Sequence, residues 1–219
     1  MKEKPYITAV IPAYNEENTI GDILKTLKSC GLINKIILIN DGSTDRTLEI
    51  VKQYNVEIIN LDSNMGKSQA VKYGCSNLKT DILFLCDGDL IGFKEYHAKK
   101  ILEPVLEGES TMSIGLRDYG TIQNYIAKMF PLISGERAIV YSVFKEMLSS
   151  KYFYDYGMEP VMNHYCEKNK LKVKSIALNY NHVLKTKKMK VLGLILLIRE
   201  LLHIFYICLA LKINGKQKI

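Results

Sequence analysis

The chain has 219 residues, 47% of them hydrophobic and 24% charged, which excludes wholesale disorder and fits one globular domain. Its net charge of +7 is uneven, because residues 168–219 contain twelve Lys or Arg and a single acid, Glu200. A basic tail on a mildly acidic body indicates an anionic partner, such as phosphates or a membrane surface, or else a solvated lysine-rich surface. We expect no nucleic-acid partner.

The five cysteines form no CxxC pair and show no metal-binding spacing, which favours reduced thiols. The apolar run near the N-terminus is too short for a signal peptide. These features predict a cytoplasmic location, either free or peripheral on the inner face of the cell membrane.

The first half of the chain alternates between short apolar runs and amphipathic segments. The apolar runs predict four strands, at residues 7–12, 35–40, 56–61 and 81–86. The segments between them predict three helices, at residues 18–30, 45–54 and 67–78. Apolar strands that alternate with helices favour a mostly parallel sheet covered by helices on both faces, which is an α/β fold.

The second half of the chain is less regular. It predicts strands at 111–117 and 171–180, helices at 95–108, 142–150 and 156–169, and a helix or ordered loop at 120–130. Pro104 is expected to interrupt the first of these helices, whereas Pro160 fits a first helical turn. We divide the chain into two halves of one domain, residues 1–90 and 91–188, and a C-terminal segment, residues 189–219.

The last apolar segment, Val191–Leu211, would be about 30 Å long as a helix, close to the thickness of a bilayer core. Arg199, Glu200 and His203 lie in its middle, and a central Arg costs about 2.5–3.5 kcal/mol on insertion. A helix in the plane of a membrane surface therefore fits better than a span. Packing against the body of the protein, or against a second copy in a homodimer, is the alternative.

A polar cluster follows each of the four strands predicted in the first half. These clusters should converge, because parallel sheets bind ligands beyond the carboxyl ends of their strands. The last cluster, Asp87-Gly88-Asp89, places two like charges one residue apart. Two such carboxylates can hold Mg²⁺, which in turn binds substrate phosphates. A simple turn is the alternative, and metal binding requires that no buried lysine holds these carboxylates.

Four motifs in order, VIPAYNEENTI, IINDGSTDRT, NMGKSQAVKYG and LFLCDGDL, resemble the nucleotide-sugar-binding half of family-2 glycosyltransferases of the GT-A fold. The resemblance implies a Rossmann-like sheet, a nucleotide-sugar donor that is most often UDP-linked, and a Mg²⁺ or Mn²⁺ cofactor. It assigns the donor site to Pro12, Tyr14, Glu16, Asp41, Lys67, Asp87 and Asp89. Asp41 would bind the base, and Asp87 and Asp89 the ribose and the metal-bound diphosphate. One departure is Asn40 where many members have an aspartate.

Residues 131–139 (PLISGERAI), 156–169 and 179–188 resemble two kinds of relative. One kind is the glucosyl-3-phosphoglycerate synthases, and the other is the polyprenyl-phosphate sugar synthases, which have a membrane-associated C-terminus. The resemblance implies that Glu159 contacts the sugar or the acceptor and that His182 joins the metal. Arg137 and Arg117 are candidates for binding an acceptor phosphate, since a guanidinium matches phosphate geometry.

Inverting relatives commonly have Glu-Asp at the acceptor site, whereas this chain has Glu159-Pro160. Either Glu159 is the general base, or the reaction needs no strong base. An acceptor phosphate is already ionised and needs no general base. A retaining transfer needs none either, because the departing diphosphate takes the proton.

The sequence therefore predicts a metal-dependent glycosyltransferase that uses a UDP-linked, glucose-like donor and a phosphate-bearing acceptor, with Asp89 and Glu159 as catalytic residues. The acceptor is either a polyprenyl phosphate at the membrane or a small soluble phosphorylated molecule. A catalytically inactive sugar-nucleotide-binding or membrane-tethering domain is the non-enzymatic alternative. A nucleotidyltransferase or a dinucleotide-binding oxidoreductase is disfavoured, because no glycine-rich phosphate loop follows the first strand.

Overall fold

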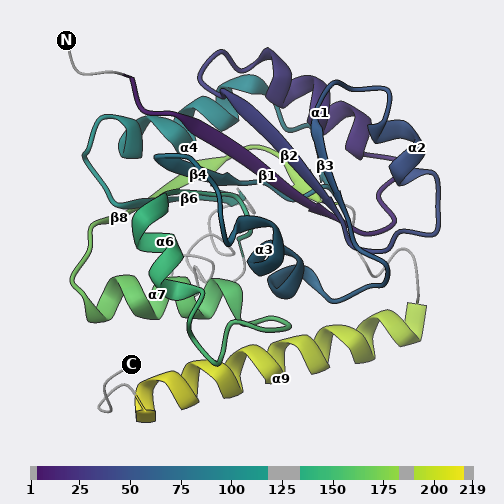
Figure 1. Ribbon diagram of the computed structural model, residues 1–219. Helices are drawn as coiled ribbons and strands as arrows, with labels where there is room; N and C mark the ends of the chain where they lie inside the picture. Colours follow the sequence, from purple (N-terminus) through teal and green to yellow (C-terminus); the bar gives the residue numbers. More distant parts are fainter. Residues whose placement is uncertain (1–3, 118–133, 183–189, 215–219) are drawn as a thin grey trace.

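The computed structural model describes residues 4–117, 134–182 and 190–214, and a seven-stranded sheet forms the centre of the fold (Figure 1). The first half supplies four of its strands, and all of them run parallel. These are β1 (Ile7–Ala13), β2 (Lys35–Asn40), β3 (Glu57–Asn60) and β4 (Ile82–Leu85). Their order in the sheet is β3-β2-β1-β4, which confirms the four predicted strands.

Helices cover both faces of this sheet, as the apolar strands predicted (Figure 1). One face packs against α1 (Ile20–Ser29), α2 (Thr47–Val51) and α4 (Glu95–Leu106). The other face packs against α3 (Lys67–Cys75), α6 (Tyr141–Met147) and α7 (Met158–Lys168). Successive residues of β1 alternate between the two cores, so Val10 belongs to one core and Ile11 to the other.

The second half completes the same sheet with β7 (Arg137–Val140), β6 (Met112–Arg117) and β8 (Val173–Leu178). β7 is antiparallel to both β4 and β6, whereas β6 and β8 are parallel. The predicted strands at 111–117 and 171–180 are confirmed, but β7 has only four residues and was not predicted. Antiparallel β7 places residues 134–136 of the second half beside the end of β4. The predicted segment 120–130 lies outside the described residues.

The prediction that Pro104 interrupts its helix is wrong, because α4 continues through it to Leu106. The ring lies only two residues from the end of the helix and is buried in the core. A proline costs most in a helix interior, where both its missing N–H and its ring disturb a preceding turn. Pro160 lies in the first turn of α7, as predicted.

Two further elements flank the sheet. β5 (Leu90–Ile91) and β9 (Asn181–His182) form a small antiparallel ribbon directly after the Asp87-Gly88-Asp89 turn. α9 (Lys190–Asn214) lies along the outside of α7, where Ile207 and Leu211 join the core (Figure 1). Among the described residues, no helix combines the length and apolarity that a membrane crossing requires.

Candidate active site

The loops that follow β1 and β2 are joined by hydrogen bonds. Asn15 adopts a left-handed backbone conformation (φ 58°), and its side-chain oxygen accepts a hydrogen bond from the Thr44 amide at 2.8 Å. The Glu16 amide donates to Thr47 Oγ1, also at 2.8 Å. Asparagine tolerates this conformation better than most residues, so the loop can turn back onto its neighbour. The first two polar clusters of the sequence therefore form one surface.

Asp41 connects the second cluster to the third. Its side chain is buried, and its two carboxylate oxygens accept hydrogen bonds from the amides of Met65 at 2.7 Å and Gly66 at 3.0 Å. Gly42 (φ +70°) crosses the same loop so closely that a Cβ there would lie 2.6 Å from the carbonyl carbon of Ser63. Asp41 thus fixes the loop that leads into α3, which begins at Lys67. Its role in base binding stays a prediction.

The Asp87-Gly88-Asp89 turn is hydrogen-bonded to the start of α1. Thr19 Oγ1 donates a hydrogen bond to the Gly88 carbonyl at 2.7 Å. A Cβ on Gly88 would lie 3.4 Å from Glu16 Cγ, so the aspartate turn and the loop after β1 are in contact. All four polar clusters therefore meet at the carboxyl edge of the sheet, as predicted.

Lys67 joins the aspartate turn to the second half of the chain. Its ammonium lies 2.7 Å from Asp87 Oδ1 and 2.9 Å from Glu159 Oε1. Burial lowers the pKa of Lys67, but the adjacent carboxylates of Asp87 and Glu159 outweigh that effect and raise it above its usual value. The ammonium is therefore a fixed positive charge between one acid from each half of the domain.

Along the chain, 92 positions separate Lys67 from Glu159 and 20 separate Lys67 from Asp87, so the pair with Glu159 connects the two halves of the domain.

The lysine contact bears directly on the sequence interpretation. That interpretation treated a buried lysine on the aspartate pair as evidence against a metal-bound donor. Asp87 does have such a partner, but Lys67 is itself one of the residues assigned to the donor site, and 33% of its side chain is exposed. The contact therefore lies at an accessible edge of the sheet, and an incoming cation or phosphate would compete with it.

Gly135 brings the second half of the domain against this cluster. A Cβ at this position would lie 2.5 Å from Lys67 Nζ and 2.6 Å from Asp87 Oδ1, well inside ordinary van der Waals contact. A side chain at this position would have to displace the Lys67 ammonium or the Asp87 carboxylate, so glycine keeps that contact undisturbed. Gly135 lies in the segment 131–139 that resembles known relatives, but it was not among the predicted site residues. The signal available in the sequence was a glycine directly before the acidic residue Glu136.

Glu159 is positioned by the first turn of α7, which is tied to the start of α3. The Ser68 hydroxyl donates to the Asp155 carbonyl at 2.5 Å and accepts the Met158 amide at 3.2 Å. Further along α7, Asn163 accepts a hydrogen bond from Arg137 at 2.6 Å. The side chain of Arg137 is fully buried, and its Nε also donates to the Ser134 carbonyl at 2.9 Å.

Glu136 and Tyr180 form a buried polar pair behind the aspartate turn. The Tyr180 hydroxyl lies 2.6 Å from Glu136 Oε2, and Ser134 contacts the same carboxyl oxygen at 3.1 Å. Burial, followed by the neighbouring Glu136, raises the pKa of Tyr180, so the phenol keeps its proton and donates it. Tyr180 is two residues before His182, and the β5–β9 register places His182 opposite Leu90, next to Asp89.

The remaining predicted site residues are placed as follows. Pro12 is the partly buried residue near the end of β1, and Tyr14 beyond it is 44% exposed. Arg117 ends β6, but its side chain and that of His182 lie outside the described part of the structure. Arg137 has no exposed surface, and its acceptor role, like that of Arg117, stays a prediction.

A divalent cation fits the chemistry of this edge. Asp87 and Asp89 supply hard carboxylate oxygens, which divalent cations prefer. Asp87 already pairs with one positive charge, the Lys67 ammonium. Within residues 4–117, 134–182 and 190–214, no group of three His, Cys, Asp or Glu side chains forms a ready metal cluster. The role of His182 as a metal ligand stays a prediction.

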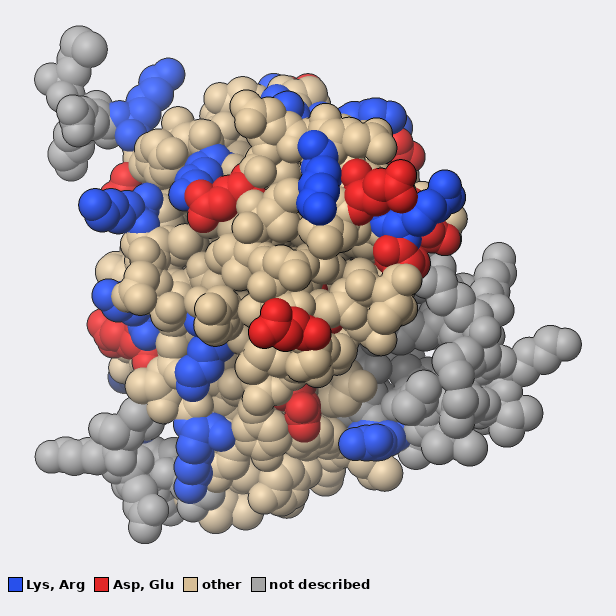
Figure 2. Space-filling view, turned by 45° about the vertical axis from the view of Figure 1, so that its right-hand side comes forward, with Lys and Arg blue, Asp and Glu red and all other residues tan. Residues whose placement is uncertain are grey.

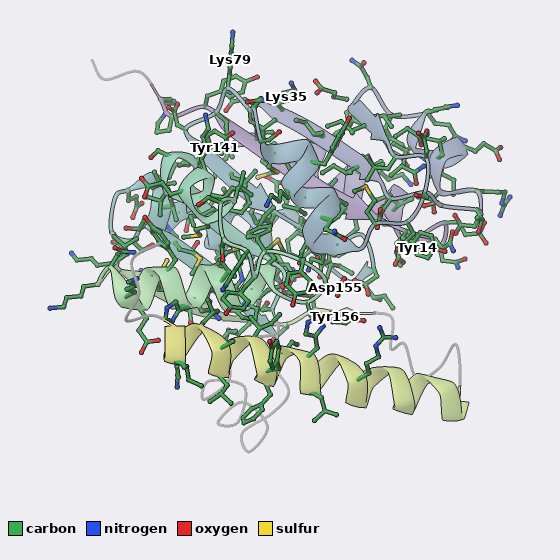
Figure 3. The ribbon with its side chains drawn as sticks, turned by 60° about the horizontal axis from the view of Figure 1, so that its bottom comes forward. Tyr14, Lys35, Lys79, Tyr141, Asp155 and Tyr156 are labelled. Carbon is green, nitrogen blue, oxygen red and sulfur yellow. The ribbon has the colours of Figure 1, made fainter. Side chains whose placement is uncertain are left out.

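Figure 3 shows Tyr14, Asp155 and Tyr156 on the side of the domain that faces α9, with Lys35 and Lys79 at the far edge. A shallow groove at that far edge is lined by residues including Tyr6, Lys35, Glu57 and Lys79. It lies at the amino ends of the strands, away from Asp87 and Glu159. Open α/β sheets bind ligands at the opposite edge, so we assign the groove no part in the site.

Comparison with known proteins places the chain in a family. Residues 8–171 match the family model described as Glycosyl transferase family 2. A dolichyl-phosphate beta-glucosyltransferase of Trichomonas vaginalis is 25% identical over 245 residues, covering 93% of this chain and 74% of that protein. An undecaprenyl-phosphate 4-deoxy-4-formamido-L-arabinose transferase of Edwardsiella ictaluri is 33% identical over 95 residues, but this covers only 39% of the chain and 29% of that protein.

A solved structure shares the fold. Glucosyl-3-phosphoglycerate synthase from Mycobacterium tuberculosis, in complex with Mn²⁺, UDP-glucose and phosphoglyceric acid, superposes with a TM-score of 0.73 at 19% identity. The match covers 93% of this chain and 80% of that one. Together with the family match, it confirms the predicted GT-A fold.

Proposed function

The chain belongs to glycosyl transferase family 2, and from this premise we propose that it transfers a glucose-like sugar from a UDP-linked donor to a phosphate-bearing acceptor. A polyprenyl phosphate is the acceptor we favour, because two relatives are named for transfer to dolichyl phosphate and undecaprenyl phosphate. The chain covers only part of each relative, so donor and acceptor are proposals for this protein.

One observation carries the proposal: Lys67 is paired with both Asp87 and Glu159. Asp87 belongs to the turn assigned to the donor, and Glu159 to the helix assigned to the acceptor. A single cationic side chain therefore touches both halves of the expected reaction centre. A diphosphate or an acceptor phosphate entering there would find a lysine with a raised pKa, which stays protonated and can pair with it.

Asp87 and Asp89 would hold a Mg²⁺ or Mn²⁺ ion, with His182 as the proposed third ligand. When bound, such an ion neutralises negative charge on the leaving diphosphate. The protein residues supply the positioning. Thr19 fixes the Gly88 carbonyl, and Asp41 holds the loop that leads into Lys67. Pro12, Tyr14 and Glu16 line the edge where the nucleoside would lie.

Glu159 has two possible roles, and its contacts favour one of them. A general base must direct a lone pair toward the acceptor, and Glu159 Oε1 is already 2.9 Å from the Lys67 ammonium, which leaves only Oε2 for that role. An ionised phosphate acceptor needs no base. We therefore assign Glu159 to holding Lys67 and orienting the acceptor, with the acceptor phosphate itself as the nucleophile.

A panel of nucleotide sugars with Mn²⁺ or Mg²⁺, scored for nucleotide release, tests the proposal. We expect UDP release from UDP-glucose, stimulated by a polyprenyl phosphate more than by 3-phosphoglycerate. Stimulation by 3-phosphoglycerate alone would favour the soluble-acceptor alternative. Asp89→Asn should abolish metal-dependent release, whereas Glu103→Gln, which changes an exposed acid on α4, should not alter it.

Glu159→Gln separates the two roles of that residue. Loss of a general base typically lowers turnover by about 100- to 10,000-fold. A smaller loss, accompanied by a higher KM for the acceptor, would agree with an orienting role. UDP binding that metal does not strengthen, together with no UDP release from any donor, would favour the inactive-domain alternative and contradict the proposal.

A further inference from the structure

Helix α9 has two apolar faces on opposite sides of its axis. Ile204, Ile207 and Leu211 are buried against the body of the domain. The opposite side carries five large apolar side chains that are each about half or more exposed, which we call the outer stripe: Leu202 (64%), Phe205 (68%), Tyr206 (58%), Leu209 (49%) and Ile213 (65%). Burial against α7 therefore accounts for only one of the two apolar faces.

The outer stripe is continuous along the helix. At 3.6 residues per turn its five members fall within a sector about 100° wide, which is the apolar width typical of an amphipathic helix. Exposed Arg199 and Lys212 border this sector on its two sides. Figure 2 shows the lower part of the molecule, where α9 lies in Figure 1, as a largely uncharged surface with basic side chains to either side.

We propose that the outer stripe of α9 docks on the surface of an anionic lipid bilayer, with the helix in the plane of the membrane. Arg199 and Lys212 border the stripe, and the sequence of residues 168–219 contains twelve Lys or Arg and one acid, so this segment of the chain attracts anionic headgroups. A second copy of the chain would bring two equally basic segments together, which opposes dimerisation through this face. The arrangement of an apolar stripe between basic side chains is that of helices that bind lipid interfaces.

The docking surface lies close to the candidate active site. On the inner side of α9, His203 Nδ1 is 3.8 Å from an Asp155 carboxylate oxygen, and its ring contacts that of Tyr154. The Asp155 carbonyl accepts the Ser68 hydroxyl, next to Lys67. A bilayer held by the outer stripe would therefore lie on the same side of the domain as this loop and the start of α3.

Vesicle flotation tests the docking without any measurement of activity, so its failure is distinguishable from failure of the proposed function. The full chain is mixed with vesicles of phosphatidylcholine alone or of equal parts phosphatidylcholine and phosphatidylglycerol. We expect flotation with the anionic vesicles and weaker flotation at high salt, because salt screens the attraction. The double variant Phe205→Ser/Leu209→Ser should lower the partition coefficient by about tenfold for each side chain removed.

Tyr96→Ser is the matched control, because Tyr96 is a half-exposed aromatic residue on α4, on the other face of the sheet. It should float like the wild type, and circular dichroism should show all three proteins folded. Wild-type protein that does not float, or a stripe variant that floats equally well, would overturn the proposal. So would sedimentation showing a dimer that the stripe variant abolishes, because the stripe would then be a protein interface.

Discussion

Replacing Gly135 with alanine tests how closely the two halves of the domain must approach at the site. The added methyl would lie 2.6 Å from Asp87 Oδ1 and 2.5 Å from Lys67 Nζ, whereas ordinary contact begins at 3.4 Å. Asp87, whose Oδ2 lies still closer to the added methyl, must therefore retreat by about 1 Å, or the backbone of residues 134–136 must move by a similar distance. Misplacement of a reacting group by about 1 Å can cost about 100-fold in rate. We expect a loss of this size in metal-dependent UDP release.

The assay is initial-rate UDP release from UDP-glucose with Mn²⁺, with the affinity for UDP measured by calorimetry. Gly31→Ala is the matched control, because a Cβ at Gly31 meets no atom within 4 Å. Thermal unfolding should show both variants folded. Turnover of Gly135→Ala within about threefold of wild type, with unchanged UDP affinity, would refute the argument that the Asp87–Lys67 geometry limits the reaction.

Three further substitutions probe the structure around the site. Tyr180→Phe removes a buried hydrogen bond to Glu136 and should lower the free energy of unfolding by about 2 kcal/mol in urea titrations; no change would show that the pair is not stabilising. Asp41→Ala removes the acceptor of the Met65 and Gly66 amides, so hydrogen exchange at both should accelerate and UDP affinity should fall; unchanged exchange would contradict its loop-holding role. Burial, and then Lys100 and Lys94, lower the pKa of His97, so the unfolded chain binds its proton more tightly. The free energy of unfolding should therefore decrease as pH falls below about 6.5, and His97→Gln should reduce that dependence. Burial also lowers the pKa of His164, so part of the pH dependence should persist in the variant.

The sequence predicted the first half of the fold well. Strands β1 to β4 each contain a run of apolar residues, the helices between them have one apolar face, and each strand is followed by a polar cluster. These are local signals, and they place Asp41, Lys67 and Asp87 at one edge of the sheet before any contact is known. The second half was harder to predict. Strand β7 is only four residues long, and α4 continues through Pro104 because that proline is only two residues from the end of the helix.

The contacts of the individual site residues could not be read from local pattern. Lys67 was expected near a donor, but its pairing with both Asp87 and Glu159 joins residues far apart in the chain. Gly135 could have been any turn glycine until antiparallel β7 placed it against that pair. Arg137 has the chemistry of a phosphate ligand, yet its guanidinium is buried and bound to Asn163 and Ser134.

The amino-acid sequence alone determined the class of the sheet, the edge at which polar residues gather, and the uneven charge of the C-terminal segment. Those properties depend on periodicity and composition, which are set by neighbours in the chain. The tertiary structure decided which carboxylates share the Lys67 ammonium, where the second half requires glycine, and which face of α9 remains exposed. These depend on chain crossings and packing between distant segments, because burial and ion pairing arise only once those segments meet.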